Sequence, residues 1–251
     1  MDILIGAPVY DRAWILPDWF AAIEAQDFPL SNIGFAFEAA PHDEDTIECL
    51  FEWHALHPEV LCFDVGLNHD TRHQSHPEGR RRWNKDRYHD MVEFRNTLLD
   101  RAINYNYDRY FSLDTDVLLE DTATISRLAE FTEKPVAVSP LMYMTPVGTR
   151  YPSIMSWVGQ PGQRAMRFRN YPLGTTFQSD VIMAAKMMSY DVYQNVRYSW
   201  HAQGEDLGWS YNCYKQKFKL YSMSDIYAPH IMSRSMLKTY REHGDTRKEL
   251  T

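Results

Sequence analysis

The amino-acid sequence predicts an α/β fold in which a mostly parallel central sheet is flanked by helices. In residues 1–141, short apolar runs alternate about five times with segments whose apolar residues recur at helical spacing. Strands and helices that alternate in this way build parallel sheets with helices on both faces. Residues 142–251 follow a less regular pattern. We therefore expect residues 1–251 to form a single domain made of two halves.

The expected strands of the first half are short runs rich in apolar and β-branched residues. The first run, DILIGAPV, has Pro8 close to its end, which suits a buried strand. The run YFSL ends directly before Asp114. The five strands are expected at residues 2–9, 32–39, 60–65, 110–113 and 135–141.

The expected helices each carry an apolar stripe with a period of three to four residues. They are predicted at residues 14–26, 43–57, 91–104 and 122–131. The stripes consist of Leu16, Trp19, Phe20 and Ile23 in the first, Ile47, Leu50 and Phe51 in the second, and Met91, Phe94, Leu98, Leu99 and Ala102 in the third.

Two stretches interrupt this rhythm. Residues 68–90 are polar and are predicted to form a long loop. Residues 145–174 are rich in proline, glycine and aromatic residues, and we expect loops there that cover a site. The remaining predictions are a strand at 178–184, helices at 187–194 and 205–216, and a strand at 218–222.

Composition restricts the class of protein. Hydrophobic residues make up 44% of the chain, enough for a full core, and the net charge of −8 argues against broad binding to nucleic acid or membrane surfaces. The three cysteines are odd in number and lack zinc-site spacing, which indicates free thiols in a reducing compartment. No leader-like or membrane-spanning run of apolar residues is evident, so we expect a soluble, cytoplasmic protein with no membrane partner.

Asp114-Thr115-Asp116 is a candidate metal site at the end of a strand. In open α/β sheets, ligands bind at the carboxyl ends of the strands. Two carboxylates in this position offer the hard oxygen ligands that Mg²⁺ and Mn²⁺ prefer. A solvated strand end with ordinary turn acids is the competing interpretation of this tripeptide.

Three further features have both a functional and an ordinary interpretation. Glu205 and Asp206 begin a predicted helix, where acids complement the helix dipole or serve as a general base. His230 follows the last predicted strand and is either a metal ligand or a histidine without a special role. Arg95 lies on the helix before the Asp-Thr-Asp strand and is either a surface charge or a group that reaches a phosphate or an acid.

The order of these features resembles that of the GT-A (Rossmann-like) glycosyltransferases over nearly the whole chain. The segment GEDLGWSYNCYKQKFKLYSMSDIYAPH is similar to the Gly-Glu-Asp helix, strand and metal-ligand histidine of family 2-like and β-1,4-galactosyltransferase-like inverting enzymes. The resemblance implies a GT-A-like domain with a nucleotide-sugar-binding half, residues 1–141, and an acceptor-binding half, residues 142–251. It implies transfer of a sugar from a nucleoside-diphosphate sugar, with a UDP-sugar favoured, to an acceptor hydroxyl with inversion.

The same resemblance implies roles around the diphosphate and the acceptor. Asp116 would bind Mn²⁺ or Mg²⁺ directly, and Asp114 would contact the ribose or bind the metal through water. His230 would be the last protein ligand of the metal. Asp206 would be the catalytic base, and Glu205 would place the acceptor.

On the nucleotide side, the resemblance implies a second group of residues. Pro8, Tyr10 and Arg12, in the loop after the first strand, would hold the nucleotide base together with Asp64 at the end of the third strand. Arg95 would face the nucleotide. The chain departs from the family pattern near the acceptor, where Trp200 replaces the usual Trp-Gly-rich lid, so a retaining mechanism stays open if Asp206 is not near the anomeric carbon.

The segment Arg72–Arg87 is basic although the chain is acidic. It contains six lysine or arginine residues with Trp83 among them, a combination in which arginine binds phosphate and tryptophan stacks on a base. A solvated loop is the ordinary interpretation. The functional hypothesis is that the acceptor is a modified base in DNA, with a glycan as the other candidate.

Two other functions compete with glycosyl transfer. A sugar nucleotidyltransferase would share the alternating sheet but usually opens with a glycine-rich loop, whereas GAPVYDR has a single glycine. A non-catalytic carbohydrate- or nucleotide-binding module is the alternative from another class, and the intact acids argue against it.

The DNA hypothesis gives a first prediction. Replacing Arg80, Arg81 and Arg82 together with alanine removes three phosphate-binding cations, so DNA binding should be lost. Hydrolysis of the donor should be unchanged, because the donor site lies elsewhere. An electrophoretic mobility shift assay measures the first effect, and an unchanged DNA affinity would remove the hypothesis.

Overall fold

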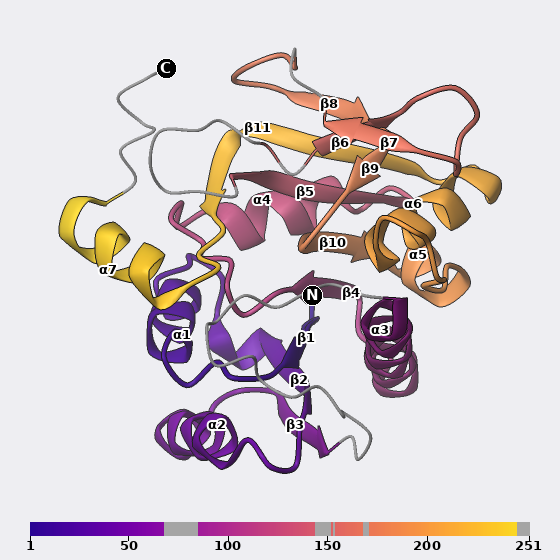
Figure 1. Ribbon diagram of the computed structural model, residues 1–251. Helices are drawn as coiled ribbons and strands as arrows, with labels where there is room; N and C mark the ends of the chain where they lie inside the picture. Colours follow the sequence, from indigo (N-terminus) through magenta and orange to yellow (C-terminus); the bar gives the residue numbers. More distant parts are fainter. Residues whose placement is uncertain (68–84, 144–151, 153, 168–170, 245–251) are drawn as a thin grey trace.

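The structure is a computed structural model that describes residues 1–67, 85–143, 152, 154–167 and 171–244. A twisted sheet of eight strands runs through the molecule in the order β3-β2-β1-β4-β10-β5-β11-β8 (Figure 1). Its strands are β1 (Ile3–Val9), β2 (Ile33–Ala39), β3 (Cys62–Leu67), β4 (Arg109–Leu113), β5 (Val136–Tyr143), β8 (Thr176–Ser179), β10 (Ala185–Ser189) and β11 (Lys219–Pro229).

Most neighbours in this sheet are parallel. β1 pairs in parallel with both β2 and β4, β2 pairs in parallel with β3, and β5 pairs in parallel with β11. The antiparallel strand β10 lies between β4 and β5, and β8 is added antiparallel to β11 at the edge. The carboxyl ends of β1, β2 and β4 therefore share one edge, where the loops that carry the candidate site begin.

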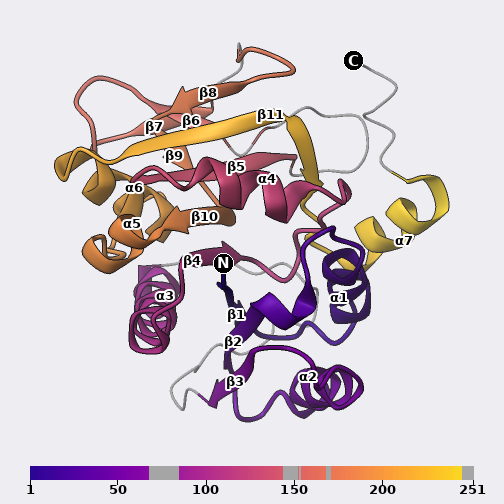
Figure 2. The same cartoon turned by 180° about the vertical axis from the view of Figure 1, so that it is seen from behind.

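Helices cover both faces of the sheet, as the views from front and back show (Figure 2). α1 (Leu16–Glu24), α2 (Glu44–Leu56) and α4 (Thr124–Phe131) pack their apolar side chains on one face, and α3 (Lys85–Tyr105), α5 (Tyr190–Asn195) and α6 (Glu205–Lys215) pack on the other. The remaining elements are η1 (Leu30–Asn32), α7 (Arg234–His243) and a small antiparallel sheet of β6 (Ile154–Trp157), β7 (Ala165–Arg167) and β9 (Val181–Ile182).

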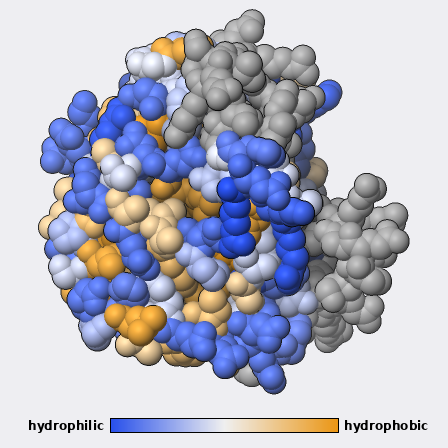
Figure 3. Space-filling model, turned by 90° about the vertical axis from the view of Figure 1, so that its left-hand side faces the viewer, coloured by the Kyte–Doolittle hydropathy of each residue, from blue (hydrophilic) through white to orange (hydrophobic). Residues whose placement is uncertain are grey.

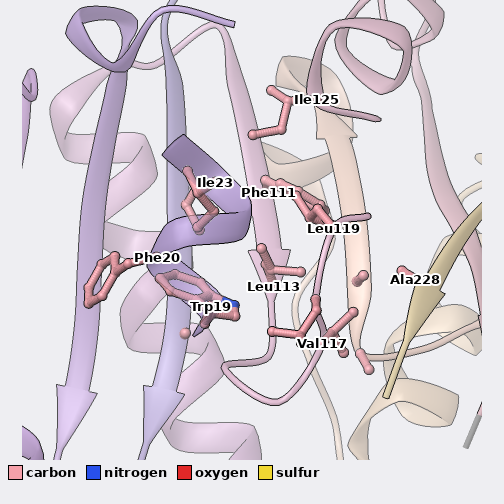
Figure 4. Close-up of a cluster of buried hydrophobic side chains, with 14 of the residues drawn as sticks. Trp19, Phe20, Ile23, Phe111, Leu113, Val117, Leu119, Ile125 and Ala228 are labelled. Atoms are coloured by element: carbon pink, nitrogen blue, oxygen red, sulfur yellow. The ribbon is translucent and has the colours of Figure 1, made fainter. Parts of the chain in front are cut away.

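The larger core cluster supports the turn that follows β4. Trp19 of α1 is fully buried and packs with Leu113 and Val117, on either side of this turn (Figure 4). The Trp19 indole Nε1 donates a hydrogen bond to the backbone oxygen of Asp114 at 3.2 Å. The position of the Asp-Thr-Asp turn is thus fixed from the core side by a large, rigid side chain.

The alternating first half and the mostly parallel sheet are confirmed. The predicted strands and helices up to residue 141 are all present, with ends shifted by one to three residues for most of them. The predicted loop at 68–90 is wrong at its C-terminal end, because α3 begins at Lys85; residues 68–84 lie outside the described part. The first turn of α3 is charged and polar, so it lacks the apolar spacing from which a helix start is predicted.

The secondary structure of the second half differs from the prediction at more points. Residues 187–189 belong to strand β10, not to the predicted helix, which begins only at Tyr190. The predicted strand at 178–184 is two strands, β8 and β9, in different sheets. β6 and β7 occupy part of the stretch expected to be loops, and the last strand is longer than predicted because it runs on to Pro229.

Three more properties bear on the expectations. No described helix combines the length and the apolar composition that crossing a bilayer requires. Cys49, Cys62 and Cys213 are free thiols in the structure. The face seen in Figure 3 mixes hydrophilic side chains with scattered hydrophobic ones.

The packing of α6 yields a stability prediction. A Cβ added at Gly208 would lie 1.9 Å from the backbone oxygen of Ser199, so the helix approaches this chain segment closely. Gly208→Ala should therefore lower the free energy of unfolding by about 1–3 kcal/mol through overpacking. Chemical denaturation measures this loss, with Tyr214→Ala on the exposed side of the same helix as the control. A Gly208→Ala variant as stable as the parent would contradict the close approach.

Candidate active site

The Asp-Thr-Asp turn closes directly after β4. The backbone N–H of Asp114 donates to the oxygen of Ala184 at 2.9 Å, and Val117 N–H donates to the oxygen of Asp114 at 3.0 Å. Thr115 is buried under the turn. The carboxylates of Asp114 and Asp116 flank this buried residue and enter separate networks of charged side chains.

Arg95 is the centre of the first network. Arg95 as a whole residue is only 1% exposed. Its guanidinium donates hydrogen bonds to three groups. Nη2 donates to Asp114 Oδ1 at 2.8 Å, Nη1 to Ser112 Oγ at 3.0 Å, and Nε to Glu205 Oε1 at 3.1 Å. The ring of Tyr198 lies 5.6 Å from the guanidinium carbon. One cation of α3 thereby ties the end of β4 to the start of α6.

Asp206 has a cation of its own. The fully buried Lys186 of β10 donates through Nζ to Asp206 Oδ1, and the backbone N–H of Ala184 donates to Asp206 Oδ2 at 3.2 Å. Burial by itself would raise the pKa of Asp206, but Lys186 and Arg95 outweigh it and hold this pKa below its usual value. Asp206 is therefore an ionised carboxylate whose two oxygens are both oriented.

Glu205 has a different electrostatic environment although it is the adjacent residue. Burial, and then the negative charge of Asp206, raise the pKa of Glu205 against the opposing effect of Arg95. Both acids stand in the first turn of α6, where the helix dipole favours negative charge. Gly204 precedes them with φ of 124°, a conformation that favours glycine, and a Cβ added there would lie 3.5 Å from the ring of Tyr88.

Asp116 is the centre of the second network. Arg12 Nη2 lies 2.6 Å from Asp116 Oδ2, and His230 Nε2 lies 3.0 Å from Asp116 Oδ1. Burial alone would lower the pKa of His230, but Asp116 outweighs it and raises this pKa above its usual value. A carboxylate, a guanidinium and an imidazole from three distant parts of the chain thus meet at one point.

The length of β11 explains how His230 reaches this point. The strand continues past a register shift beside β5 to Pro229. The backbone N–H of His230 then donates to the oxygen of Tyr143 at 3.0 Å, and that of Ile231 donates to the oxygen of Asp116 at 2.6 Å. The backbone of this segment is therefore hydrogen-bonded to the Asp-Thr-Asp turn itself.

Comparison with known proteins identifies the family of the chain. The model of the N-terminal domain of glycosyltransferase family 25 matches residues 2–156. The chain belongs to glycosyltransferase family 25. A family 25 member from Aedes aegypti is 22% identical over 205 residues, covering 78% of this chain and 33% of that protein. One from Drosophila pseudoobscura pseudoobscura is 27% identical over 131 residues, covering 50% of this chain and 20% of the relative. The chain thus spans about a third or less of the length of these relatives.

Solved structures show that this family 25 chain has the GT-A fold. GalNAc-T7 with UDP, GalNAc and Mn²⁺ aligns with a TM-score of 0.65 at 11% identity, covering 92% of this chain and 44% of that one. The mannosyltransferase PcManGT of Pyrobaculum calidifontis, with GDP-Man and Mn²⁺, aligns with a TM-score of 0.58 at 11% identity. The alignment covers 95% of this chain and 59% of that one. TarS of S. aureus with UDP-GlcNAc aligns with a TM-score of 0.57 at 16% identity, covering 93% and 61%.

Most site residues predicted for this family 25 chain converge, but Asp64 does not join them. β3 extends to Leu67, so Asp64 lies within the strand and not at its end. Its carboxylate accepts a hydrogen bond from the Tyr105 hydroxyl at 2.8 Å and lies 3.4 Å from Arg101 Nε. Arg101 also pairs with Glu38 near the end of β2. Asp64 thus belongs to a separate cluster of charged groups on α3 and the outer strands.

The nucleotide-side loop is only partly as predicted. Pro8 lies in β1, and Tyr10 follows the strand with its ring edge on to His42 at 5.6 Å between centroids. The guanidinium of Arg12 lies on Asp116, and its predicted contact with the nucleotide base stays a prediction. Asp11, directly before it, has φ of 52°, in the left-handed region.

Two contributors to the site were missed from the sequence. Lys186 stands alone in the apolar run VIMAAKMM, and a lone lysine in a predicted buried strand signals a paired internal charge. Arg87 was assigned to a basic loop but lies in the first turn of α3. Burial and then Arg12 lower the pKa of Arg87, while Glu205 and Asp116 act in the opposite direction, so Arg87 is close to both networks.

The donor chemistry around Asp116 fits a divalent cation. Asp116 and His230 would be its protein ligands, since a carboxylate and a neutral imidazole both bind such cations and their side chains meet at 3.0 Å. In the described part of the chain, no group of three His, Cys, Asp or Glu residues is arranged to hold a metal ion. Mg²⁺-type ions commonly take one or two protein ligands together with substrate phosphates, so a site with two protein ligands suits a cation that a diphosphate helps to bind.

The Lys186–Asp206 pair gives a stability prediction. Lys186→Met leaves a buried carboxylate without its closest cation and should lower the free energy of unfolding by about 3–5 kcal/mol. The double variant Lys186→Met/Asp206→Asn should recover part of this loss, because a neutral amide needs no counter-ion. Chemical denaturation of the three proteins gives the values.

A surface pair provides the matched control. Arg241 forms two hydrogen bonds with Asp18 and is 57% exposed, so Arg241→Gln should cost less than about 1 kcal/mol. A Lys186→Met variant that loses no more stability than Arg241→Gln would contradict the importance of the buried pair.

Proposed function

We propose that this domain is a metal-dependent, inverting glycosyltransferase that uses a nucleoside-diphosphate sugar as donor. The observation that carries the proposal is the meeting of Asp116, His230 and Arg12 at the carboxyl edge of the sheet. A carboxylate and an imidazole there can bind a divalent cation, and the guanidinium suits a phosphate. The family assignment and the nucleotide-sugar complexes of the structural neighbours support the same donor class.

The residues divide into a donor group and an acceptor group. Asp116 and His230 would hold Mn²⁺ or Mg²⁺, which when bound neutralises charge on the leaving diphosphate. Asp114, which accepts a hydrogen bond from Arg95, would contact a ribose or a water on the metal. Pro8, near the end of β1, and Tyr10, just after it, would contact the nucleotide. A UDP-sugar is favoured as donor because UDP or a UDP-sugar occurs in more than one of the aligned structures, although PcManGT holds GDP-Man.

On the acceptor side, Asp206 is proposed as the proton acceptor. Its ionised state, maintained by Lys186, is the protonation state that a proton acceptor requires. The acceptor oxygen attacks the anomeric carbon while the bond to the diphosphate breaks. The hydroxyl proton passes to Asp206, and the nucleoside diphosphate leaves with the bonding electrons. Glu205, held by Arg95, would orient the acceptor.

The division into halves and the acceptor also belong to this proposal. Residues 1–141 would bind the donor and residues 142–251, with α6 and the small sheet, would bind the acceptor. A glycan and a modified base in DNA are the two candidate acceptors. Residues 72–84, on which the DNA hypothesis depends, lie outside the described residues, whereas Arg87 lies beside the site.

Calorimetry tests the donor proposal. UDP or GDP should bind the parent protein in the presence of Mn²⁺, and Asp116→Ala should lose at least about tenfold in affinity because a metal ligand is removed. Arg241→Gln, in the exposed pair with Asp18 that belongs to neither network, should bind as the parent does. If neither nucleotide binds the folded parent with Mn²⁺, the metal-dependent function is wrong.

A further inference from the structure

The two arginines at the site are held very differently. Arg95 is buried and donates to Asp114, Ser112 and Glu205. Within the described part of the chain, the Arg12 guanidinium donates to one side chain, that of Asp116, makes a long contact of 3.4 Å to the Asp11 backbone oxygen, and has the Trp14 ring 6.0 Å away. Arg95 is therefore part of the framework, whereas Arg12 can leave its partner by a change of side-chain rotamer.

The backbone of Arg12 stays anchored when its side chain moves. Thr46 Oγ1, at the start of α2, accepts hydrogen bonds from the N–H groups of Arg12 at 3.0 Å and Ala13 at 3.2 Å. The N–H of Asp11 donates to Asp43. The loop is thus fixed through main-chain contacts, and only the guanidinium depends on Asp116.

The cation position at Asp116 is already occupied by protein groups. Arg12 Nη2 lies 2.6 Å from Asp116 Oδ2, and His230 Nε2 lies 3.0 Å from Asp116 Oδ1. Arg87 adds a further positive charge near Asp116. A divalent cation that entered alone would therefore meet two guanidinium groups in a mostly buried place, whereas a diphosphate that entered with it would offset the added charge.

We propose that the guanidinium of Arg12 takes the place of the divalent cation on Asp116 while no donor is bound, and transfers to the donor diphosphate when cation and nucleotide enter together. The exchange gives each charged group a partner in both states. Asp116 passes from Arg12 to the cation, and Arg12 passes from Asp116 to phosphate, for which its planar donors are well suited. Arg12 is thus a positioning residue that makes binding of the cation dependent on the nucleotide.

This inference rests on the proposed donor site and makes its own measurable claim. In the parent, Mn²⁺ alone should bind weakly. UDP or GDP should greatly increase the affinity for Mn²⁺, since the two ligands are coupled through Arg12. In Arg12→Gln, Mn²⁺ alone should bind about tenfold or more tightly than to the parent, because its competitor is gone. The nucleotide should then add far less to the affinity for Mn²⁺.

The experiment is calorimetric titration of Mn²⁺ without nucleotide, with UDP and with GDP. It compares the parent, Arg12→Gln, Arg12→Lys and the surface control Arg241→Gln. Arg12→Lys keeps the positive charge, so it should retain weak binding of Mn²⁺ alone. A thermal unfolding scan with and without Mn²⁺ verifies that each variant is folded and repeats the comparison, since a tighter ligand raises the midpoint more.

The outcomes separate the two proposals. If the parent shows nucleotide-dependent Mn²⁺ binding and Arg12→Gln retains the same dependence, Arg12 is not the competitor, and only this inference is overturned. If the parent binds neither Mn²⁺ nor nucleotide, the donor site itself is wrong, and the inference fails with it. Tighter binding of Mn²⁺ alone to Arg12→Gln, but not to Arg241→Gln, supports the exchange.

Discussion

The hydrogen bonds of Arg95 are the constraint on which the site depends. This buried guanidinium joins the end of β4, through Ser112 and Asp114, to Glu205 at the start of α6. Without this cation, the buried carboxylate of Glu205 and the partly buried carboxylate of Asp114 would lie close together with no guanidinium between them. Arg95 and the backbone of Ala184, which bonds both Asp114 and Asp206, together hold α6 against the Asp-Thr-Asp turn. Because Arg95 is buried and donates to three groups, it sets the geometry within which the less firmly held Arg12 can move.

The arrangement also explains how one sheet presents two chemical environments. Around Asp116, side chains from the segments that follow β1, β4 and β11 meet at the carboxyl edge of the sheet. A diphosphate and its cation can approach this edge. Around Asp206, a buried lysine and a backbone N–H fix an ionised carboxylate at the start of a helix. Arg95 joins the neighbouring acids of the two environments, Asp114 and Glu205. Fold alone does not fix a function, and it is this pairing of a cation-and-phosphate site with an oriented carboxylate that supports glycosyl transfer.

Much of the fold could be predicted from the sequence, and the reasons for the failures are physical. The strands and helices of the first half have regular apolar periods, so the parallel sheet and the place of Asp114 and Asp116 at a strand end followed directly. Asp64 was misplaced because strand ends cannot be read to within a few residues from an apolar run. Lys186 was missed because its partner, Asp206, is distant in sequence. The contact between Arg12 and Asp116 joins residues 104 positions apart, and no periodicity reveals it.

Anomalous diffraction at the manganese edge, from crystals of the protein soaked with Mn²⁺ and UDP, tests the central claim most directly. We expect one strong manganese peak in contact with both Asp116 and His230, with the diphosphate beside it. The guanidinium of Arg12 should have turned from Asp116 to the phosphate. A manganese peak elsewhere, or bound UDP with Asp116 still paired to Arg12, would contradict it.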